Sequence, residues 1–565
     1  MPPQVPDARA GPTPFSCLLA AAVLACTLIP GSNGLRRSLD LTLGAAIILP
    51  VLYLATRVGP KSHRPAAVPR VLVLWSIPLP MFLASLFALE LTLAAIISTS
   101  VFERIPHVQD SIAQLFHAKI LARGHLTAPS PPLPQFFAQE HVILSAGRWY
   151  SQYPPGHIGV LALGVLAGAP WLVNPLVGAL TVVTLYFVGR ELWDDRTGRL
   201  CAVLGLLSPF VLFMSSEFMN HASALLGIAL FIFFFARSLR LSSVLWGLAA
   251  GLALGFVGTI RPFSAAGVAL PFAVFGVWQL VRRPRQLLAP VLAMCAGVGV
   301  MLGPLLAFNS ATNGSALVFG YHVLYGRGHD PGFGHSGKGE PHTPLAGLFN
   351  TFDNLAGLNQ YLFEWPFPSL LFVAVLFALR ARNRWDALLL ASGVSLVVFY
   401  LFYWYQDLCF GPRFLYEASV TWLALSARGM LAAFDQVAGE PDVTVRGRRH
   451  RFLVSVLAAG WAIGLGISVP ARVREYADAY WGVDRTVLNA LERQHIREGL
   501  VFVNSTYGAV LPANSPWLDQ PLIFAIDRDR RNQRLVKLFP HATAWLEQDG
   551  ALVPHPSIEP AGAGR

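Results

Sequence analysis

VFERIPHVQDSIAQLFHAKILARGHL (residues 101–126) and GRWYSQYPPGH (residues 147–157) bound the polar stretch around which the rest of the chain is arranged. The segment before residue 101 and nearly everything after residue 157 are apolar runs of membrane-crossing length. The stretch itself is rich in carboxylates, histidines and aromatic residues. Unpaired charge in a lipid interior is costly, so these groups must lie outside the hydrocarbon core or line a wet cavity. The stretch therefore predicts chemistry at one face of a membrane.

The composition is that of a polytopic membrane protein. The 565-residue chain is 54% hydrophobic and 13% charged, with a mean hydropathy of +0.52, which is more apolar sequence than a soluble core needs. The net charge of +11 comes from short basic clusters between apolar runs. This is the pattern of topology signals, so membrane lipids are expected partners and nucleic acid is not.

The apolar runs predict the number of membrane spans. With about 20 residues per crossing, about 13 runs are long enough. They lie near residues 14–34, 41–57, 71–100, 171–193, 198–215, 221–239, 243–260, 263–282, 287–308, 366–382, 386–405, 413–433 and 452–470. The run 157–169 is too short to cross and is expected to lie partly in the interface. The predicted fold class is an all-α polytopic membrane protein.

Basic residues predict the orientation of these spans. If the span count holds, the Lys- and Arg-rich loops share one face, which the positive-inside rule makes cytoplasmic. These loops lie at about 57–70, 190–199, 237–240, 282–285, 380–384 and 428–451. The N-terminus is then cytoplasmic. The opposite face receives the polar stretch 101–157, the loops 215–221, 259–263, 309–365 and 404–414, and the C-terminal tail.

Two of these external segments have compositions that predict their structure. The loop 309–365 is rich in Gly, His and Pro, which predicts a mobile polar lid. In the tail, residues 474–495 predict an amphipathic helix, and GLVFVNS (499–505) and PLIFAID (521–527) predict short strands of a small α/β appendage. The expected organisation is two N-terminal helices and a basic loop (1–70), a membrane domain (71–470) and the appendage with a disordered end (471–565).

The order of several motifs resembles the GT-C superfamily of integral-membrane glycosyltransferases. More specifically, it resembles the branch related to the protein O-mannosyltransferases and the aminoarabinose transferase of lipid A. The resemblance covers about residues 70–435. It rests on PHVQDSIAQLFHAKILARGHL (106–126), GRWYSQYPPGH, LVNPLVGALTVVTLYFVGRELW (172–193), SPFVLFMSSEFMNHAS (208–223), IRPF (260–263), HTPLAGLFNTFDNLAGLNQYLFEWP (342–366) and GPRFLYEA (411–418).

The resemblance implies a reaction, a location and an acidic site residue. Members of the superfamily transfer a sugar from a polyprenyl-phosphate carrier to an acceptor at the external face. For a bacterial member, this is the periplasmic face of the inner membrane, and the acceptor is a protein, a lipid or an envelope glycan. The family carries an acidic residue in the first external loop, often Asp followed by Glu. Asp110 matches the Asp, but Ser111 follows it, which leaves Glu103 or Glu140 as a possible second carboxylate.

Such a transfer needs a base for the acceptor proton and cations for the departing phosphate. Asp110 is the predicted general base; alternatively, it caps the helix that starts beside it. Arg261 and Arg413, at external helix ends, are predicted to bind the donor phosphate because guanidinium groups match phosphate oxygens and stay charged. The alternative for both arginines is that they are interfacial residues whose charge reaches out to water.

His221 is a third candidate for the donor phosphate. Glu217 lies four residues earlier, so the two side chains are predicted to share a helical face. This spacing alone is too weak to assign metal ligands, and a divalent metal cofactor is left open. The alternative for His221 is a hydrogen-bonded structural role.

Further residues are predicted to bind the sugar or the acceptor. Sugar faces stack on aromatic rings, although Trp and Tyr are common at membrane interfaces without any ligand. The predicted substrate-binding set is Glu140, His141, Tyr150, Tyr153, His157 and Tyr416. Tyr416 and Glu417 follow Arg413 by one helical step and are expected to orient it; Glu417 is alternatively a buried charge partner.

Two rival functions stay open at this stage. A transporter or flippase predicts ionisable residues deep within the spans and inverted repeats. The spans here carry little charge and the polar groups collect on one face, which favours surface chemistry, with Glu90 inside a span as the exception. A lipid-linked glycan ligase uses the same base and arginines and differs only in its donor.

Overall fold

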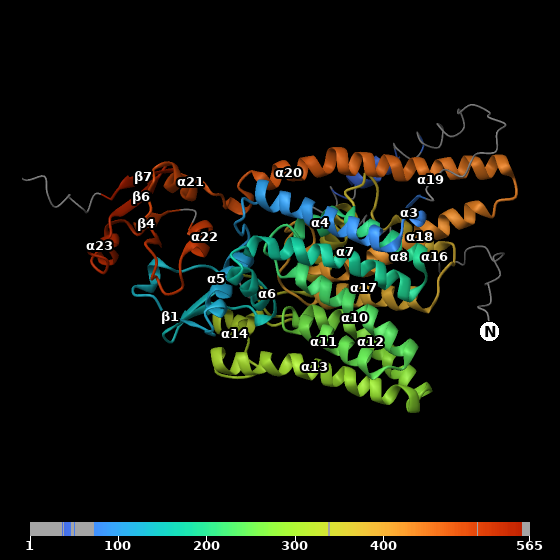
Figure 1. Ribbon diagram of the computed structural model, residues 1–565, viewed down its shortest axis with the longest axis horizontal. Helices are drawn as coiled ribbons and strands as arrows, with labels where there is room; N and C mark the ends of the chain where they lie inside the picture. Colours follow the sequence, from blue (N-terminus) through green and yellow to red (C-terminus); the bar gives the residue numbers. More distant parts are fainter. Residues whose placement is uncertain are drawn as a thin grey trace, which may run out of the picture.

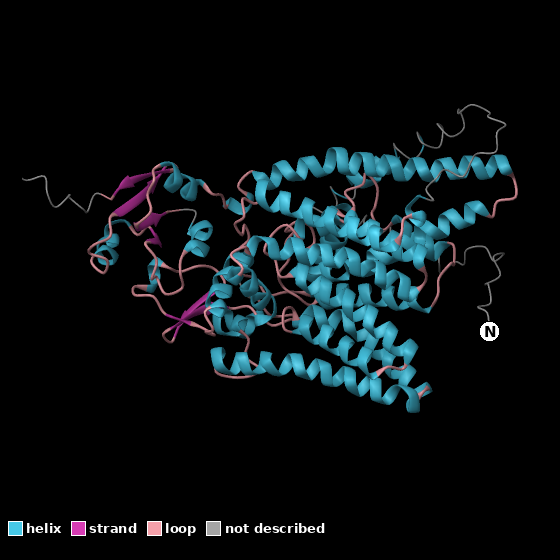
Figure 2. Ribbon diagram, viewed as in Figure 1, coloured by secondary structure: helices cyan, strands magenta, loops and turns pink. Residues whose placement is uncertain are grey.

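The protein is described by a computed structural model covering residues 73–336, 339–504 and 507–555, together with residues 37, 39–46 and 50. A bundle of long helices makes up most of it, and two small sheets lie together at one end of the long axis (Figures 1 and 2). The prediction of a mostly helical membrane protein is therefore confirmed. The small three-stranded sheet within residues 128–151 was not predicted.

The bundle is built from helices that largely follow the predicted runs. They are α3 (Val73–Ser76), α4 (Leu79–Ser100), α7 (Val173–Leu192), α8 (Asp195–Leu206), α9 (Pro209–Met214), α10 (His221–Leu241), α11 (Val244–Gly258), α12 (Pro262–Arg282), α13 (Pro284–Asn313), α16 (Leu371–Ala378), α17 (Arg384–Leu401), α18 (Ser419–Ala438), α19 (Val443–Ile463) and α20 (Val469–Ala477). Within the described residues, seven helical segments are long and apolar enough to cross a membrane. The chain is a multi-pass membrane protein.

The predicted count of thirteen spans stays a prediction. The run 14–34 and most of the run 41–57 lie outside the described residues. The run 198–215 is divided between α8 and α9, because Pro209 has no N–H to continue the helix and Ser208 caps the new one. The run 366–382 is reduced to the eight-residue α16.

Helices α11 and α13 pack backbone to backbone. A Cβ added at Gly247, Gly251 or Gly255 would lie 2.3 Å from Pro290 O, 2.0 Å from Met294 O or 2.7 Å from Met301 Cβ. The three glycines are four residues apart and so form one stripe along α11. Small residues in such a stripe let membrane helices approach closely, since lipid provides no hydrophobic drive for helices to associate.

The polar stretch 101–157 folds into a compact unit next to the bundle. It contains α5 (Gln109–Ala122), η2 (Pro134–Phe136) and the antiparallel strands β1 (Ala128–Pro129), β2 (Val142–Ser145) and β3 (Arg148–Ser151) in the order β1-β3-β2, and leads into α6 (Pro155–Leu166) and η3 (Pro170–Leu172). Ala146 and Gly147, with φ of 51° and 74°, form the two-residue turn between β2 and β3. At 12 residues, α6 is too short to span, as its sequence predicts.

The long loop, for which a mobile polar lid is predicted, contains regular helices. Residues 309–365 contain the end of α13, α14 (Gly320–Tyr325), η4 (Gly326–His329) and α15 (Pro344–Tyr361). Gly314, at φ 83°, ends α13, and Thr343 caps α15 by accepting a hydrogen bond from Ala346 N. The expectation of a loop without regular structure was therefore wrong, because its glycines and histidines were given more weight than these helix signals. That the loop forms a lid stays a prediction.

The tail contains a second, four-stranded sheet. Its strands β4 (Gly499–Val503), β5 (Leu522–Ile526), β6 (Ala544–Gln548) and β7 (Ala551–Pro554) have the order β5-β4-β6-β7, with β4 parallel to β5 and β6. Its helical pieces are α21 (Thr486–Arg493), α22 (Tyr507–Val510), η8 (Leu511–Ala513), η9 (Asp529–Arg531) and α23 (Asn532–Val536). The single helix predicted for 474–495 is wrong: Ala479 and Trp481 adopt positive φ, and α20, η7 (Tyr480–Gly482) and α21 are separate.

The appendage packs against α5, as Figure 1 shows. Ile112 and Phe116 of α5 share one apolar core with Val487, Leu500 and Val510 of the tail. Polar contacts add to this core at the far end of α5. Lys119 Nζ donates to the carbonyl oxygens of Pro512 and Asn514, and Arg123 pairs with Asp519 at 2.8 Å. The tail therefore supports the helix of the polar stretch.

The α11–α13 contact gives a first testable prediction. Gly251→Ile forces the two backbones apart, and overpacking of this kind costs about 1–3 kcal/mol. We expect a lower thermal unfolding temperature for the purified protein in detergent. Gly299→Ile on α13 is the matched control, because nothing lies within 4 Å of a Cβ at that position. Equal destabilisation by both changes would show that helix propensity, not the contact, is responsible.

Candidate active site

Asp110 lies in the first turn of α5 and is largely buried. Val108, not Asp110, is the N-cap residue, so the alternative that Asp110 caps the helix is wrong. Its Oδ1 lies 3.1 Å from Arg413 Nη1, and the Tyr153 hydroxyl donates a hydrogen bond to the carboxylate. Burial by itself raises the pKa of Asp110, but Arg413, His141 and Tyr153 together hold it well below its usual range. The group is a carboxylate at neutral pH.

Arg413 is held between two carboxylates. Its Nε lies 2.6 Å from Asp407 Oδ1, on the side opposite the Asp110 contact. The loop 404–414 turns sharply between these residues, with Phe410 at φ 57° and Gly411 at φ 126°. A Cβ at Gly411 would lie 2.8 Å from the Phe210 ring, so both conformation and space require glycine. The turn aims Arg413 at α5.

A second charged network lies at the start of α10 and α12. Glu417 Oε1 is 2.9 Å from His221 Nδ1 and 3.2 Å from Arg261 Nε. Arg261 Nη2 also donates to the Tyr400 hydroxyl at 3.1 Å. Glu417 thus orients His221 and Arg261, and the expectation that it orients Arg413 is wrong. The reason is that Glu417, on η5 (Arg413–Ala418), pairs with His221 and Arg261, whereas Arg413 pairs with Asp110 and Asp407.

The ring of Phe414 connects the two networks. The guanidinium carbon of Arg413 is 5.0 Å from the ring centroid and that of Arg261 is 5.6 Å from it. Two permanent cations from distant parts of the chain therefore meet on one aromatic side chain. Each has only part of its five N–H donors committed to protein acceptors, so the pair suits an anion with several oxygens.

Tyr321 of α14 completes this cluster from the long loop. Its ring packs edge-on against Tyr153 at a centroid distance of 5.7 Å. Burial raises the pKa of the Tyr321 hydroxyl, and this hydroxyl is electrostatically coupled to Arg261, Asp110 and Arg413. Tyr321 was not among the site residues predicted from the sequence, and neither were Asp407 and Tyr400. The aromatic run YLFYWYQD (400–407) was the available signal for the latter two.

Comparisons with known proteins concern the fold. No protein-family model matches the chain. Over 81 residues, 14% of the chain, it is 31% identical to the STT3B subunit of the dolichyl-diphosphooligosaccharide–protein glycosyltransferase from Arabidopsis thaliana, and so spans only 11% of that relative's length. ArnT from Cupriavidus metallidurans in the apo state superposes with a TM-score of 0.51 at 16% identity, covering 83% of this chain and 93% of that one. The fold is that of the GT-C glycosyltransferases.

The same ArnT bound to undecaprenyl phosphate superposes with a TM-score of 0.48 at 14% identity, with the same coverage of the two chains. The GT-C resemblance stated from the motifs is confirmed at the level of the fold. The two charged networks described above contain four residues of the quoted motifs. These are Asp110, His221, Arg261 and Arg413.

Only some of the predicted substrate-binding residues lie with these GT-C motif residues. Tyr153 contacts Asp110, and His141 Nδ1 lies 3.1 Å from the Tyr325 hydroxyl and 2.9 Å from Gln152 Nε2. Glu140 is exposed beside His141. Tyr153 and His141 therefore lie next to each other at the edge of the cluster around Asp110.

The other three predicted residues make structural contacts. The Tyr150 hydroxyl donates to Thr312 O at 3.1 Å and so ties β3 to the end of α13. His157 has both ring nitrogens occupied, at 2.9 Å from Ser223 Oγ and from Phe218 O. Tyr416 is fully buried and packs edge-on against Phe210 and His221. These rings do not line the Asp110 cluster directly.

Glu217 and His221 do not share a helical face, because α10 begins at His221 and Glu217 precedes it in a loop. Glu217 Oε1 instead accepts hydrogen bonds from Ser111 Oγ at 2.6 Å and from His107 N at 2.9 Å. Among the described residues, there is no group of three or more His, Cys, Asp or Glu placed to hold a metal ion. The Glu217–His221 pairing therefore has no geometric support, and the question of a metal cofactor stays open.

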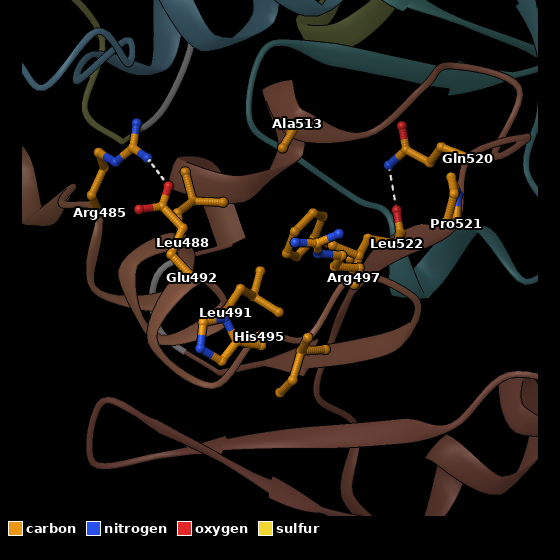
Figure 3. A pocket seen from close by; sticks show the side chains of 12 residues that line it. Arg485, Leu488, Leu491, Glu492, His495, Arg497, Ala513, Gln520, Pro521 and Leu522 are labelled. Carbon is orange, nitrogen blue, oxygen red and sulfur yellow. Dashed lines mark hydrogen bonds and ion pairs between the residues drawn. The ribbon is translucent and has the colours of Figure 1, made fainter.

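A separate cavity of about 590 Å³ lies within the appendage (Figure 3). It is lined by side chains of α21 and by the segment before β5, and Arg485 pairs with Glu492 at its rim at 2.6 Å. None of the Asp110 or Arg261 network residues lines it. The cavity is thus distinct from the candidate active site.

Glu217 gives a prediction for pH. Burial raises its pKa from 4.5 to about 7, despite the hydrogen bonds from Ser111 and His107 that oppose this shift. The folded protein keeps this carboxyl protonated up to about pH 7, whereas the unfolded chain ionises above pH 4.5. The stability that depends on Glu217 is therefore complete below pH 4.5 and is lost as the pH rises through 7.

We expect Glu217→Gln to remove this loss, so that its unfolding temperature exceeds that of the wild type at pH 8 by more than at pH 5. Exposed Glu498→Gln on the appendage is the control and should follow the wild type at both values. A constant offset across the pH range would contradict the shifted pKa.

Proposed function

We propose that the protein is a glycosyltransferase that moves a sugar from a polyprenyl-phosphate carrier to an acceptor hydroxyl at the periplasmic face of a bacterial inner membrane. The observation that carries the proposal is the buried Asp110–Arg413–Asp407 arrangement within a GT-C fold. It places a candidate base and a phosphate-binding cation side by side. The acceptor is a protein, a lipid or an envelope glycan.

The donor class is supported by the two arginines and by one structural relative. ArnT from Cupriavidus metallidurans, whose fold this chain shares, has been solved with undecaprenyl phosphate bound. In the present chain, Arg413 and Arg261 offer planar N–H donors that match phosphate oxygens, and His221 lies beside Arg261 at 3.2 Å. We assign Arg413 and Arg261 to the donor phosphate. His221 contributes by holding Arg261, because its two ring nitrogens are occupied by Glu417 and Arg261.

In the proposed reaction, the bond from the anomeric carbon to the acceptor oxygen forms as the bond to the phosphate oxygen breaks. The acceptor proton passes to Asp110, and the phosphate leaves with the electron pair, held by the arginines. Attack opposite the leaving phosphate inverts the anomeric centre. When the donor phosphate engages Arg413, Asp110 loses part of its ion pair, which raises its pKa and makes it a better base.

The sugar is assigned to the edge formed by Tyr153, Tyr321 and His141. Tyr rings offer stacking faces, and the His141 ring nitrogen and the tyrosine hydroxyls offer hydrogen bonds. Glu140, exposed beside this edge, is assigned to the approaching acceptor.

A transporter is the second candidate, and Glu90 is the observation that favours it. This carboxyl lies inside α4, is fully buried, and has no hydrogen-bond partner for either oxygen among the described residues. Ionisable groups deep in membrane helices often mark transport pathways. A lipid-linked glycan ligase shares the proposed chemistry and is distinguished by a donor that carries a long glycan.

One prediction of the proposed function concerns the general base. Purified protein in lipid is supplied with radiolabelled polyprenyl-phosphate hexoses and pentoses and with envelope extract, and sugar transfer is measured. We expect Asp110→Asn to lower transfer by about 10²-fold or more, because general-base catalysis contributes about that much, while donor binding persists. Asp519→Asn is the matched control, since Asp519 pairs with Arg123 at the other end of the same helix α5.

Transfer that survives in Asp110→Asn would move the base to Glu217 or Glu140. Absence of donor binding by the wild type across the whole panel would favour the transporter instead, and Glu90→Gln would then be tested for loss of transport.

A second prediction concerns Arg413 and pH. Since Arg413 lowers the pKa of Asp110, activity that needs the Asp110 carboxylate should persist to acidic pH in the wild type. In Arg413→Gln, the acidic limb of the kcat/KM profile should move to higher pH and the donor KM should rise about tenfold or more, the loss expected for one charge-assisted contact. An unchanged acidic limb would show that Asp110 does not titrate in this profile.

A further inference from the structure

A second cavity, of about 410 Å³, lies toward the C-terminal end of helix α10, whose first residue, His221, belongs to the candidate active site. Helix α10 carries His221 at its first residue and lines this cavity with its last turns, and α7 and α11 contribute their ends nearby. Three arginines, one glutamate and three aromatic rings line it. Arg237 and Arg240 follow His221 by 16 and 19 residues, which places them about 24–28 Å from it along the helix at 1.5 Å per residue.

A buried carboxylate orients the arginines of this cavity. Glu191 Oε2 lies 3.1 Å from Arg237 Nη1 and 2.8 Å from Arg240 Nη2, and its side chain is only 4% exposed. Arg190, one residue earlier, donates to the Tyr186 hydroxyl at 3.3 Å and interacts electrostatically with Asp195, which does not line the cavity. Two guanidinium groups thus pair with Glu191 and a third lines the cavity without contacting it, so the lining carries three cations and one carboxylate.

Two buried polar atoms of the cavity have no hydrogen-bond partner among the described residues. They are Arg237 Nε, a donor, and Glu191 Oε1, an acceptor. Buried polar groups are nearly always satisfied, so both atoms call for a ligand that accepts one hydrogen bond and donates another. A phosphate joined to a hydroxyl-bearing group has both properties.

The walls of the cavity are aromatic and continue into apolar surface. The guanidinium carbon of Arg237 lies 4.9 Å from the Trp246 ring centroid. Leu241, Val244 and Leu245, where α10 meets α11, are 51%, 51% and 69% exposed. In a chain that crosses a membrane, this surface faces lipid, so acyl chains can lie against it while a headgroup occupies the cavity.

We propose that this cavity binds the headgroup of an anionic glycerophospholipid, with its phosphate on Arg190, Arg237 and Arg240 and a headgroup hydroxyl on Glu191. Clusters of arginine at helix ends are also topology signals. A topology signal needs charge alone, however, and does not require a buried glutamate that fixes two guanidinium groups or an aromatic-walled cavity.

The test uses the full chain, stripped of lipid, and titrates dioleoyl phosphatidylglycerol while bound lipid is counted by native mass spectrometry. The wild type should hold one phosphatidylglycerol in preference to dioleoyl phosphatidylcholine. Arg190→Gln should weaken this binding about tenfold, the loss expected for one charged contact. Arg190 is exposed and Glu191 keeps its partners in this variant, so folding should be unaffected.

Arg196→Gln is the matched control. Arg196 follows α7 on the same face of the protein but pairs with Asp435 outside the cavity, with half of its side chain exposed, so binding should be unchanged. Arg237→Lys, which keeps the charge and loses Nε, should weaken binding as well. Equal weakening by Arg196→Gln, wild-type affinity in Arg190→Gln, equal binding of phosphatidylcholine, or displacement of the lipid by millimolar glycerol phosphate would each overturn the proposal.

Discussion

The ion pair between Asp110 and Arg413 is the contact on which the arrangement of the candidate site depends. Both side chains are largely removed from water, and an isolated charge there would be strongly unfavourable. Each therefore requires the other, and Arg413 also requires Asp407. Because Asp110 is on α5 and the other two are in the segment before α18, these ion pairs hold α5 against the helix bundle.

The helix ends around this pair add to the positive potential of the site. α10 begins at His221 and α12 begins directly after Arg261. The N-terminus of a helix carries a partial positive charge and unpaired N–H groups. Two such ends and two guanidinium groups converge near one phenylalanine ring, Phe414. An anionic ligand gains from all of them, which is the physical basis for assigning a lipid phosphate to this place.

Much of the fold could be predicted from the sequence, because a long apolar run can form few structures other than a membrane helix. Helices α4, α7, α10, α12 and α13 lie at predicted runs. The small sheet at 128–151 and the helices within 309–365 were missed, since short elements depend on caps and turns more than on hydrophobic period. In the site, motif order identified Asp110, His221, Arg261 and Arg413. Tyr321 depends on tertiary contacts that no local pattern records, and the aromatic run 400–407 was the only local signal for Asp407. The exact pairing of Glu417 was unpredictable for the same reason.

The shared core of α5 and the C-terminal appendage has a consequence for how the protein is made. Synthesis proceeds from the N-terminus, so the bundle helices leave the ribosome before Val487, Leu500 and Val510 exist. Until the tail has been synthesised and has folded, Ile112 and Phe116 lack their packing partners. The helix that carries Asp110 is thus seated last, and an incomplete chain holds Arg413 without a fully seated carboxylate of α5 beside it. Maturation of the site is thereby coupled to completion of the chain.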